Sequence, residues 1–125
     1  MYDKYYYPAQ QVRTLITQDY TQAYEKVDVI LAPVSPRTAF KIGEINDPTS
    51  MYLGDMFTIS INIAGNGGMN MPLGLGADSG MPVGVQIISP AFRDQNMLRV
   101  AAALEQVYGK APVAPGFADG KAVVR

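Results

Sequence analysis

Asp55 is the only charged residue between Met51 and Gly76, a stretch that is otherwise apolar, glycine or uncharged polar. A carboxylate in apolar surroundings must take up a proton, pair with a cation, or face a pocket where a ligand ammonium binds. From these residues alone, two interpretations stay open. Asp55 is either a helix-surface or backbone-bonded carboxylate, or a ligand-binding anion. If residues 50–59 are helical, Tyr52 and Met56 lie beside Asp55 on one face, as in a pocket wall.

Other polar residues near this stretch have simpler interpretations. Asn62 is typical of a helix cap or a backbone clamp, and the glycine-rich 64–68 segment favours a turn. No Lys follows these glycines, so they do not make a phosphate loop. None of the serines lies in a nucleophile elbow, and all are interpreted as caps or turn residues: Ser35, Ser50, Ser60, Ser79 and Ser89.

Composition excludes several kinds of chemistry. The chain of 125 residues has no Cys and no His, which excludes thiolate nucleophiles, disulfides and a Ser-His-Asp triad. A net charge of −1 gives no basic footprint for nucleic acid or an anionic membrane. No apolar run is long enough to span a membrane, and the N-terminus does not resemble a signal peptide. We expect a cytoplasmic protein with no metal site and no catalytic residue of its own.

Hydrophobic periodicity predicts helices and strands in alternation. A helix is expected over residues 9–25 with Pro8 near its start, then a buried strand over 27–34 and a loop. A second helix should begin near residue 48, capped by Thr49 or Ser50, although Gly54 weakens it.

The pattern in the second half of the sequence predicts a hairpin and a final helix. Strands are expected over 69–75 and 83–89, joined by a tight turn, and a helix over 94–108. Asp94 suits the N-cap of that helix and Gly109 its C-terminal end. We therefore predict an α/β domain over residues 1–109 and an irregular tail over 110–125. Three apolar strands are too few for a complete sheet, which indicates part of a wider one.

Several segments occur together in a characteristic order. They read YDKYYYPAQQVRTLI, DVILAP, MYLGD-FT-N-AG and PVGVQ, and they resemble the C-terminal part of the amidase signature family over about residues 2–108. Within that family the D-FT block is similar to the branch of tRNA-dependent amidotransferases. The resemblance implies the C-terminal segment of the amidase signature fold, with a partial mixed β-sheet covered by α-helices.

The resemblance also implies an activity for the whole protein. In this branch a Lys-Ser-Ser triad hydrolyses glutamine to glutamate and ammonia. The ammonia then amidates Glu-tRNA(Gln) or Asp-tRNA(Asn), whose carboxylate is first activated with ATP and Mg²⁺ by a partner subunit. The implied partners are glutamine, subunits B and C, misacylated tRNA and the upstream half of the same polypeptide. The triad corresponds to sequence upstream of residue 1, so we expect this chain alone to be inactive, with no cofactor of its own.

For Asp55 the resemblance implies a role in substrate binding. The Asp of this block is similar to the one that holds the α-ammonium of glutamine, while an Arg outside this chain holds the α-carboxylate. A zwitterionic substrate needs one fixed charge of each sign, which agrees with that role. One departure is visible, because many members have Leu-Pro after Ala-Gly, where this chain has Gly65-Asn66-Gly67-Gly68.

Two alternatives remain at this point. The chain could belong to another amidase-signature hydrolase that acts on a simpler amide, in which case Asp55 has no ammonium to bind. It could also be a non-catalytic interaction module. Because apolar faces and sheet edges should be uncovered, we expect the isolated chain to self-associate.

Overall fold

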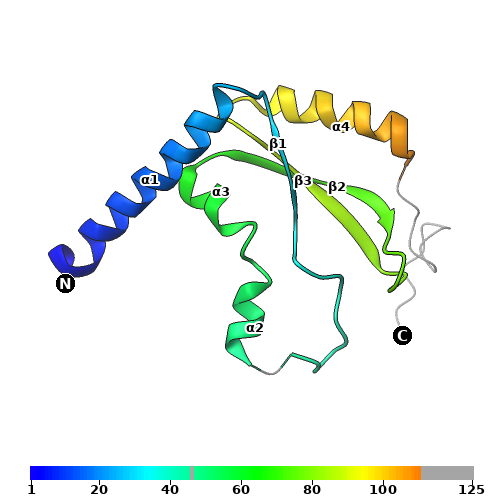
Figure 1. Cartoon of the computed structure of the whole chain (residues 1–125), viewed down its shortest axis with the longest axis horizontal. Helices are drawn as coiled ribbons and strands as arrows, with labels where there is room; N and C mark the ends of the chain where they lie inside the picture. The colour runs from blue at the N-terminus through cyan, green and yellow to red at the C-terminus, as the bar shows by residue number, and fades with distance from the viewer. Residues whose placement is uncertain (46, 111–125) are drawn as a thin grey trace, which may run out of the picture.

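A three-stranded sheet carries the last helix along one face in the computed structural model, while the first helix projects away from the sheet (Figure 1). The structure describes residues 1–45 and 47–110. A π-helical segment η1 precedes α1, and three further helices follow. Their bounds are Tyr2–Tyr6 for η1, Tyr7–Tyr24 for α1, Pro48–Leu53 for α2, Ile59–Ala64 for α3 and Asp94–Tyr108 for α4. The strands are β1 (Ile30–Pro33), β2 (Gly67–Leu75) and β3 (Pro82–Ser89).

The sheet has the order β1-β3-β2, and β3 pairs antiparallel with both neighbours. The predicted α/β class is confirmed. The described strands contain no adjacent parallel pair, so within residues 1–45 and 47–110 the sheet is antiparallel rather than mixed. The tight connection expected between the last two strands is a hairpin turn, in which the amide of Gly76 donates to the carbonyl of Met81 at 2.8 Å.

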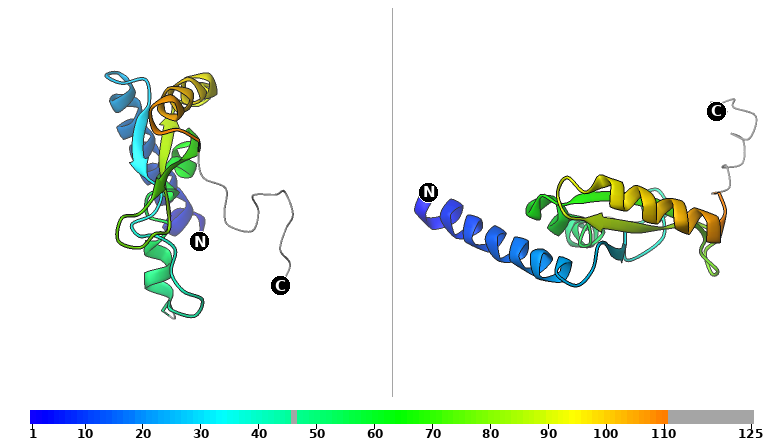
Figure 2. Two further views of the ribbon diagram at one scale, coloured as in Figure 1. Left: turned by 90° about the vertical axis from the view of Figure 1, so that its right-hand side faces the viewer. Right: turned by 90° about the horizontal axis from the view of Figure 1, so that it is seen from above.

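The core lies on both faces of β3. Ile87 is fully buried on one face, where it packs with Met71 of β2 and Met97 of α4. Figure 2 shows α4 lying along β2 and β3 when the molecule is seen from above. Ile88 points to the opposite face because side chains alternate along a strand, and it is also buried. A central strand covered on both faces explains the nearly continuous burial from Gln86 to Ser89.

The first helix begins earlier than the sequence predicts. The chain is already helical from Tyr2, and Pro8 lies in the first turn of α1. The preceding π-helical turn reduces the conflict with Pro8, which has no N–H to donate. Tyr2 and Tyr6 stack with ring centroids 4.9 Å apart, which supports this extra turn. The N-terminal part of the helix projects from the rest of the molecule (Figure 1).

The prediction of a buried strand over residues 27–34 was wrong in extent and in burial. Only Ile30–Pro33 pairs with β3, and Leu31 is 50% exposed. β1 is an edge strand whose far side has no neighbour among the described residues. The run of apolar residues therefore predicted the strand correctly. It did not show whether other parts of the chain bury these side chains.

The predicted helix from residue 48 stops at Leu53. Gly54 ends α2, and residues 54–58 form turns before α3 begins. Its cap is Asp47, whose carboxylate accepts a 2.8 Å hydrogen bond from the amide of Ser50, so the expected Thr49 or Ser50 cap was wrong. Asp47 precedes Pro48, which suits the first turn of a helix.

The last helix matches its predicted range, with small differences at its ends. Arg93 occupies the N-cap position and Asp94 is the first helical residue. Gly109 ends α4 with φ 78°, as expected for glycine after a helix. Met97 is buried on this helix, whereas Val107 near its end is 77% exposed. Of the predicted tail, residues 111–125 lie outside the described residues.

Candidate functional site

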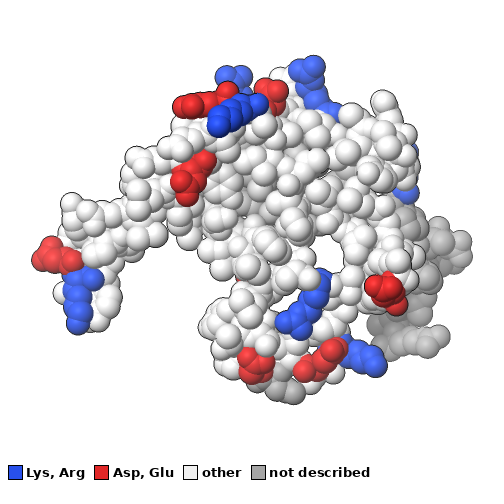
Figure 3. Space-filling model, viewed as in Figure 1, with Lys and Arg blue, Asp and Glu red and all other residues white. Residues whose placement is uncertain are grey.

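A pocket of about 360 Å³ lies between the segment that follows β1 and the turns that join α2 to α3. Figure 3 shows a hollow in this region, with a basic side chain at its rim. The lining is mainly apolar and carries one anion and one cation: Val34, Ser35, Arg37, Thr38, Ala39, Phe40, Ile45, Ser50, Met51, Gly54, Asp55 and Thr58. Its composition is that of a small-molecule site, apolar with few charged groups.

Asp55 belongs to this pocket, but it is not enclosed as expected. The helix that was predicted to carry it ends two residues earlier, and Asp55 is exposed in the turn at the pocket wall. The expectation of a carboxylate enclosed by apolar side chains was therefore wrong for the described chain. Tyr52 and Met56, expected beside Asp55, are not lining residues, whereas Met51 and Gly54 are.

The backbone of Asp55 is firmly held. Its amide donates to the carbonyl of Tyr52 at 3.1 Å, and its carbonyl accepts from the Thr58 amide, the Thr58 hydroxyl and the Ile59 amide. No hydrogen bond or ion pair among the described residues engages the carboxylate. Asp55 thus has a fixed position and a free anionic group, which is the arrangement that a ligand cation requires.

Gln86 anchors the same turn to the sheet. Its side chain is buried, and Nε2 donates a 3.0 Å hydrogen bond to the carbonyl of Phe57. Because Phe57 lies two residues after Asp55, this bond links the position of Asp55 to β3. Sequence patterns alone gave Gln86, the last residue of PVGVQ, no role. A lone polar side chain within an apolar strand was the signal that could have identified it.

The other polar residues of the block support local structure. Asn62 lies within α3 and its Nδ2 donates to the carbonyl of Thr58 at 2.9 Å, which confirms the backbone-clamp interpretation. Ser60 bonds Tyr20 of α1 with an oxygen–oxygen distance of 2.8 Å, which joins the two helices. Ser35 and Ser79 accept bonds from amides two residues later, as predicted for turn residues. These hydrogen bonds support local structure, and of the four side chains only Ser35 also lines the pocket.

The glycine-rich segment 65–68 is a helix end followed by a strand. Gly65 ends α3 in the left-handed region at φ 74°, and β2 begins already at Gly67, so only the first half is the expected turn. A Cβ at position 67 would lie 3.0 Å from Met97 Cε and 3.0 Å from Ser89 Oγ. The departure from Leu-Pro at this place thus accompanies close packing of Met97 against the strand.

Arg37 is a pocket residue that the sequence patterns did not single out. It lies in the segment after β1, which was predicted only as a loop, and it is exposed. The hydrogen bond from the Ser50 amide, and to a smaller extent the positive charge of Arg37, hold the pKa of the Asp47 carboxyl below its usual value. No hydrogen bond or ion pair among the described residues fixes the guanidinium group of Arg37, so it remains available at the pocket.

Metal and membrane features are limited to what the described residues show. Residues 1–45 and 47–110 contain no group of three or more Asp or Glu side chains placed to hold a metal ion. None of the described helices is long and apolar enough to cross a membrane.

Comparison with known families places the chain among amidases. The family model described as Amidase matches residues 1–98, and the chain belongs to this family. It is similar to the A subunit of glutamyl-tRNA(Gln) amidotransferase from Corynebacterium glutamicum, with 52% identity over 105 residues. That match covers 83% of this chain and 21% of the relative. The corresponding protein of Oleidesulfovibrio alaskensis is 54% identical over 114 residues, which is 90% of this chain and 23% of the relative.

Solved structures give the same result. The crystal structure of the A subunit of glutamyl-tRNA(Gln) amidotransferase from Thermotoga maritima matches with a TM-score of 0.79 and 42% identity. That match covers 86% of this chain and 24% of the solved chain. A 6-aminohexanoate cyclic dimer hydrolase matches with a TM-score of 0.68 at 24% identity, over 81% of this chain and 23% of that one, which shows the shared fold alone. The chain spans about a fifth to a quarter of the relatives it matches.

Proposed function

We propose that this chain is a C-terminal segment of the glutamine-hydrolysing subunit of a tRNA-dependent amidotransferase, and that it forms one wall of the glutamine pocket. The observation that carries the proposal is the 52% identity over 105 residues to proteins named as part of such an amidotransferase. The free carboxylate of Asp55 in an otherwise mainly apolar pocket supports it.

In this proposal Asp55 binds the α-ammonium of glutamine. An ammonium–carboxylate contact in a mainly apolar pocket is a charge-assisted hydrogen bond and is stronger than a neutral one. The backbone bonds of Asp55 and the Gln86 anchor hold the backbone of this turn in place, so only the side chain of Asp55 must be ordered on binding. The Lys-Ser-Ser triad that attacks the amide lies, by the family resemblance, in sequence outside this chain, and the segment alone is inactive.

The proposed complex follows from the same relationship. Subunits B and C and the misacylated tRNA would be partners of the whole protein, and ATP with Mg²⁺ would serve the partner subunit that activates the tRNA-linked carboxylate. Such a role in translation fits the cytoplasmic location expected from the sequence. The remaining part of the whole protein would complete the sheet and close the pocket.

The test uses the full-length protein in complex with its partners. We expect Asp55→Asn to lower kcat/KM for glutamine by about tenfold or more, because a charged hydrogen-bond partner is lost. Hydrolysis of glutaramic acid, which has the same amide but no α-amino group, should be unchanged. Asp78→Asn, an exposed Asp in the hairpin turn, is the matched control and should leave both reactions unaltered.

The outcomes separate the alternatives. If Asp55→Asn lowers both reactions equally, Asp55 has a structural role. If the wild-type complex hydrolyses simple amides but not glutamine, the chain belongs to an amidase of a different specificity.

A further inference from the structure

Arg37 and Asp55 place opposite charges on one pocket. Both line the cavity of about 360 Å³, Arg37 from the segment after β1 and Asp55 from the turn after α2. These two segments are separated by residues 38–54 of the sequence and meet at this cavity in the folded chain. Most of the remaining lining is apolar, so these two side chains dominate the electrostatic character of the site.

The two charges do not neutralise each other. No ion pair joins Arg37 to Asp55 among the described residues, and neither the carboxylate nor the guanidinium has a hydrogen-bond partner there. The amide of Arg37 donates to Ser35 Oγ at 3.5 Å. The pKa of Asp47 is lowered mainly by the Ser50 amide and only weakly by the charge of Arg37, whose guanidinium forms no hydrogen bond or ion pair among the described residues. Two free groups of opposite sign at one cavity suit a ligand that carries both charges.

The size of the pocket limits that ligand to a small molecule. An α-amino acid presents a carboxylate and an ammonium on the same carbon, and a guanidinium binds a carboxylate through two parallel hydrogen bonds. We infer that Arg37 is a specificity-determining residue that binds the α-carboxylate of the amino-acid substrate while Asp55 binds its α-ammonium. This inference rests on the proposed function, since it names a second contact to the same glutamine.

Arg37 would act beside the Arg that the family resemblance implies outside this chain. Two cations can share one carboxylate because each of its oxygens has free lone pairs. Removal of Arg37 should then weaken binding in part rather than abolish it, and the effect should appear mainly in KM. The chemistry at the amide, at the other end of the substrate, should be little affected.

The experiment compares three amides that differ by one charged group. Glutamine has both groups, glutaramic acid lacks the α-amino group, and 4-aminobutanamide lacks the α-carboxylate. In the full-length complex we expect Arg37→Met to raise KM by about tenfold for glutamine and for glutaramic acid, with little change for 4-aminobutanamide. Arg37→Lys should recover part of the loss, because it keeps the charge without the planar fork.

Asp55→Asn should show the opposite selectivity, affecting glutamine and 4-aminobutanamide but not glutaramic acid. Arg13→Met, an exposed Arg on α1 away from the pocket, is the matched control. If Arg37→Met changes all three substrates equally, or none of them, Arg37 does not read the carboxylate and the inference fails. The proposed function survives either result as long as the wild type hydrolyses glutamine.

A wild type that hydrolyses none of the amides would overturn the proposed function instead. Calorimetric binding of the same three compounds then tests Arg37 directly. Loss of affinity in Arg37→Met limited to the two carboxylates supports the inference, and equal affinity in variant and wild type rejects it.

Discussion

The fixed backbone and free carboxylate of Asp55 distinguish it from Asp47, an acidic residue earlier in the sequence. Asp47 uses its carboxylate to cap α2, and the bond from the Ser50 amide lowers its pKa. Asp55 has no comparable partner among the described residues. The same residue type thus serves structure at one position and remains available for binding eight residues later, which local sequence does not distinguish.

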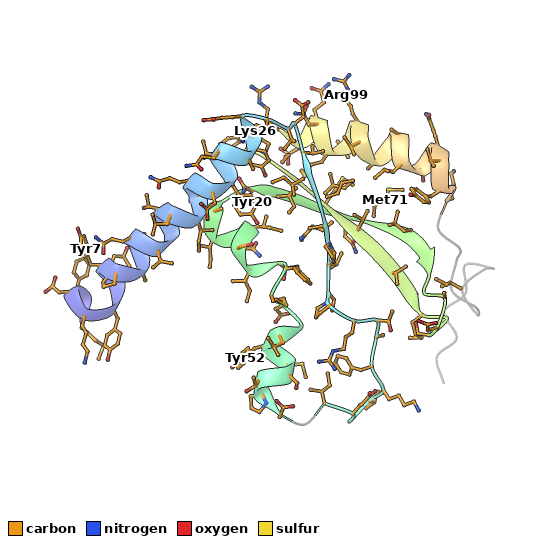
Figure 4. All side chains as sticks on the ribbon, viewed as in Figure 1. Tyr7, Tyr20, Lys26, Tyr52, Met71 and Arg99 are labelled. Atoms are coloured by element: carbon orange, nitrogen blue, oxygen red, sulfur yellow. The ribbon has the colours of Figure 1, made fainter. Side chains whose placement is uncertain are left out.

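Tyr24 carries a second unpartnered group, at the end of α1. Figure 4 labels Tyr20 on α1, beside α3, and Tyr24 stacks on its ring at a centroid distance of 6.2 Å. The Tyr24 hydroxyl is buried and has no hydrogen-bond partner among the described residues. Burial, and then the neighbouring Tyr20, raise the pKa of Tyr24 to about 12. A buried hydroxyl without a partner destabilises the fold.

Tyr24→Phe should therefore raise the free energy of unfolding by about 1 kcal/mol near pH 7. The wild type should also lose stability as the pH rises from about 10 towards 12, because the unfolded Tyr ionises first while the folded one stays protonated. The variant should lack this part of the decline. Urea unfolding of the full-length wild type and variant, near pH 7 and again between about pH 10 and 12, measures the difference in stability between them.

Tyr108→Phe provides the control, since Tyr108 is exposed at the end of α4. It should change neither the stability near pH 7 nor its dependence on pH. A Tyr24→Phe protein that is less stable than wild type near pH 7 would show that the hydroxyl has a favourable partner after all.

At the scale of elements, β2 and β3 approach each other closely at Gly84. Gly84 of β3 pairs with Pro72, next to the register shift between Pro72 and Gly74. A Cβ on Gly84 would lie 2.7 Å from Asn70 Oδ1 and 3.0 Å from the Met71 carbonyl. The second of these contacts is with backbone, which cannot move without disturbing the strand pair.

We expect Gly84→Ala to lower the free energy of unfolding by about 1–3 kcal/mol, the usual range for overpacking. Thermal and urea unfolding of the full-length protein provide the measurement. Gly68→Ala is the matched control in the neighbouring strand. Its added Cβ would meet Ile61 Cγ2 at 3.6 Å, an ordinary contact, and stability should change by no more than about 0.5 kcal/mol. Equal effects of the two changes would contradict the packing argument.

At the scale of the whole molecule, the described chain leaves many large apolar side chains in contact with solvent. They occur on every helix and on β1 and β2, and they include Tyr52 at 72% exposed. Figures 1 and 2 show α1 extending from the sheet with little else beside its N-terminal half. Apolar surface of this extent is characteristic of an interface.

The isolated chain of 125 residues should therefore self-associate and bind a hydrophobic dye. Light scattering after size-exclusion chromatography measures its mass, and dye fluorescence measures the exposed apolar surface. Association should weaken when the rest of the whole protein is supplied in trans, because both would compete for the same faces. A monomeric, dye-free and protease-resistant chain would instead favour an independent interaction module.

Sequence patterns predicted most elements because their signals are local. The hairpin over β2 and β3 and the range of α4 follow from alternation, turn residues and an apolar stripe, all readable within a few residues. The ends of the helices were less predictable. For α2 the sequence offered Thr49 and Ser50 as caps, but Asp47 forms the capping hydrogen bond and Gly54 ends the helix.

The sequence by itself determined the family and the alternation of helices and strands, and it singled out Asp55 as a lone charge in an apolar block. Only the tertiary structure decided that Asp55 is exposed, that Gln86 anchors its turn, and that Arg37 lines the same pocket. The physical reason is distance along the chain. Secondary-structure preference depends on nearby residues, whereas the presence of two opposite charges at one cavity depends on how separate elements pack, which no local pattern records.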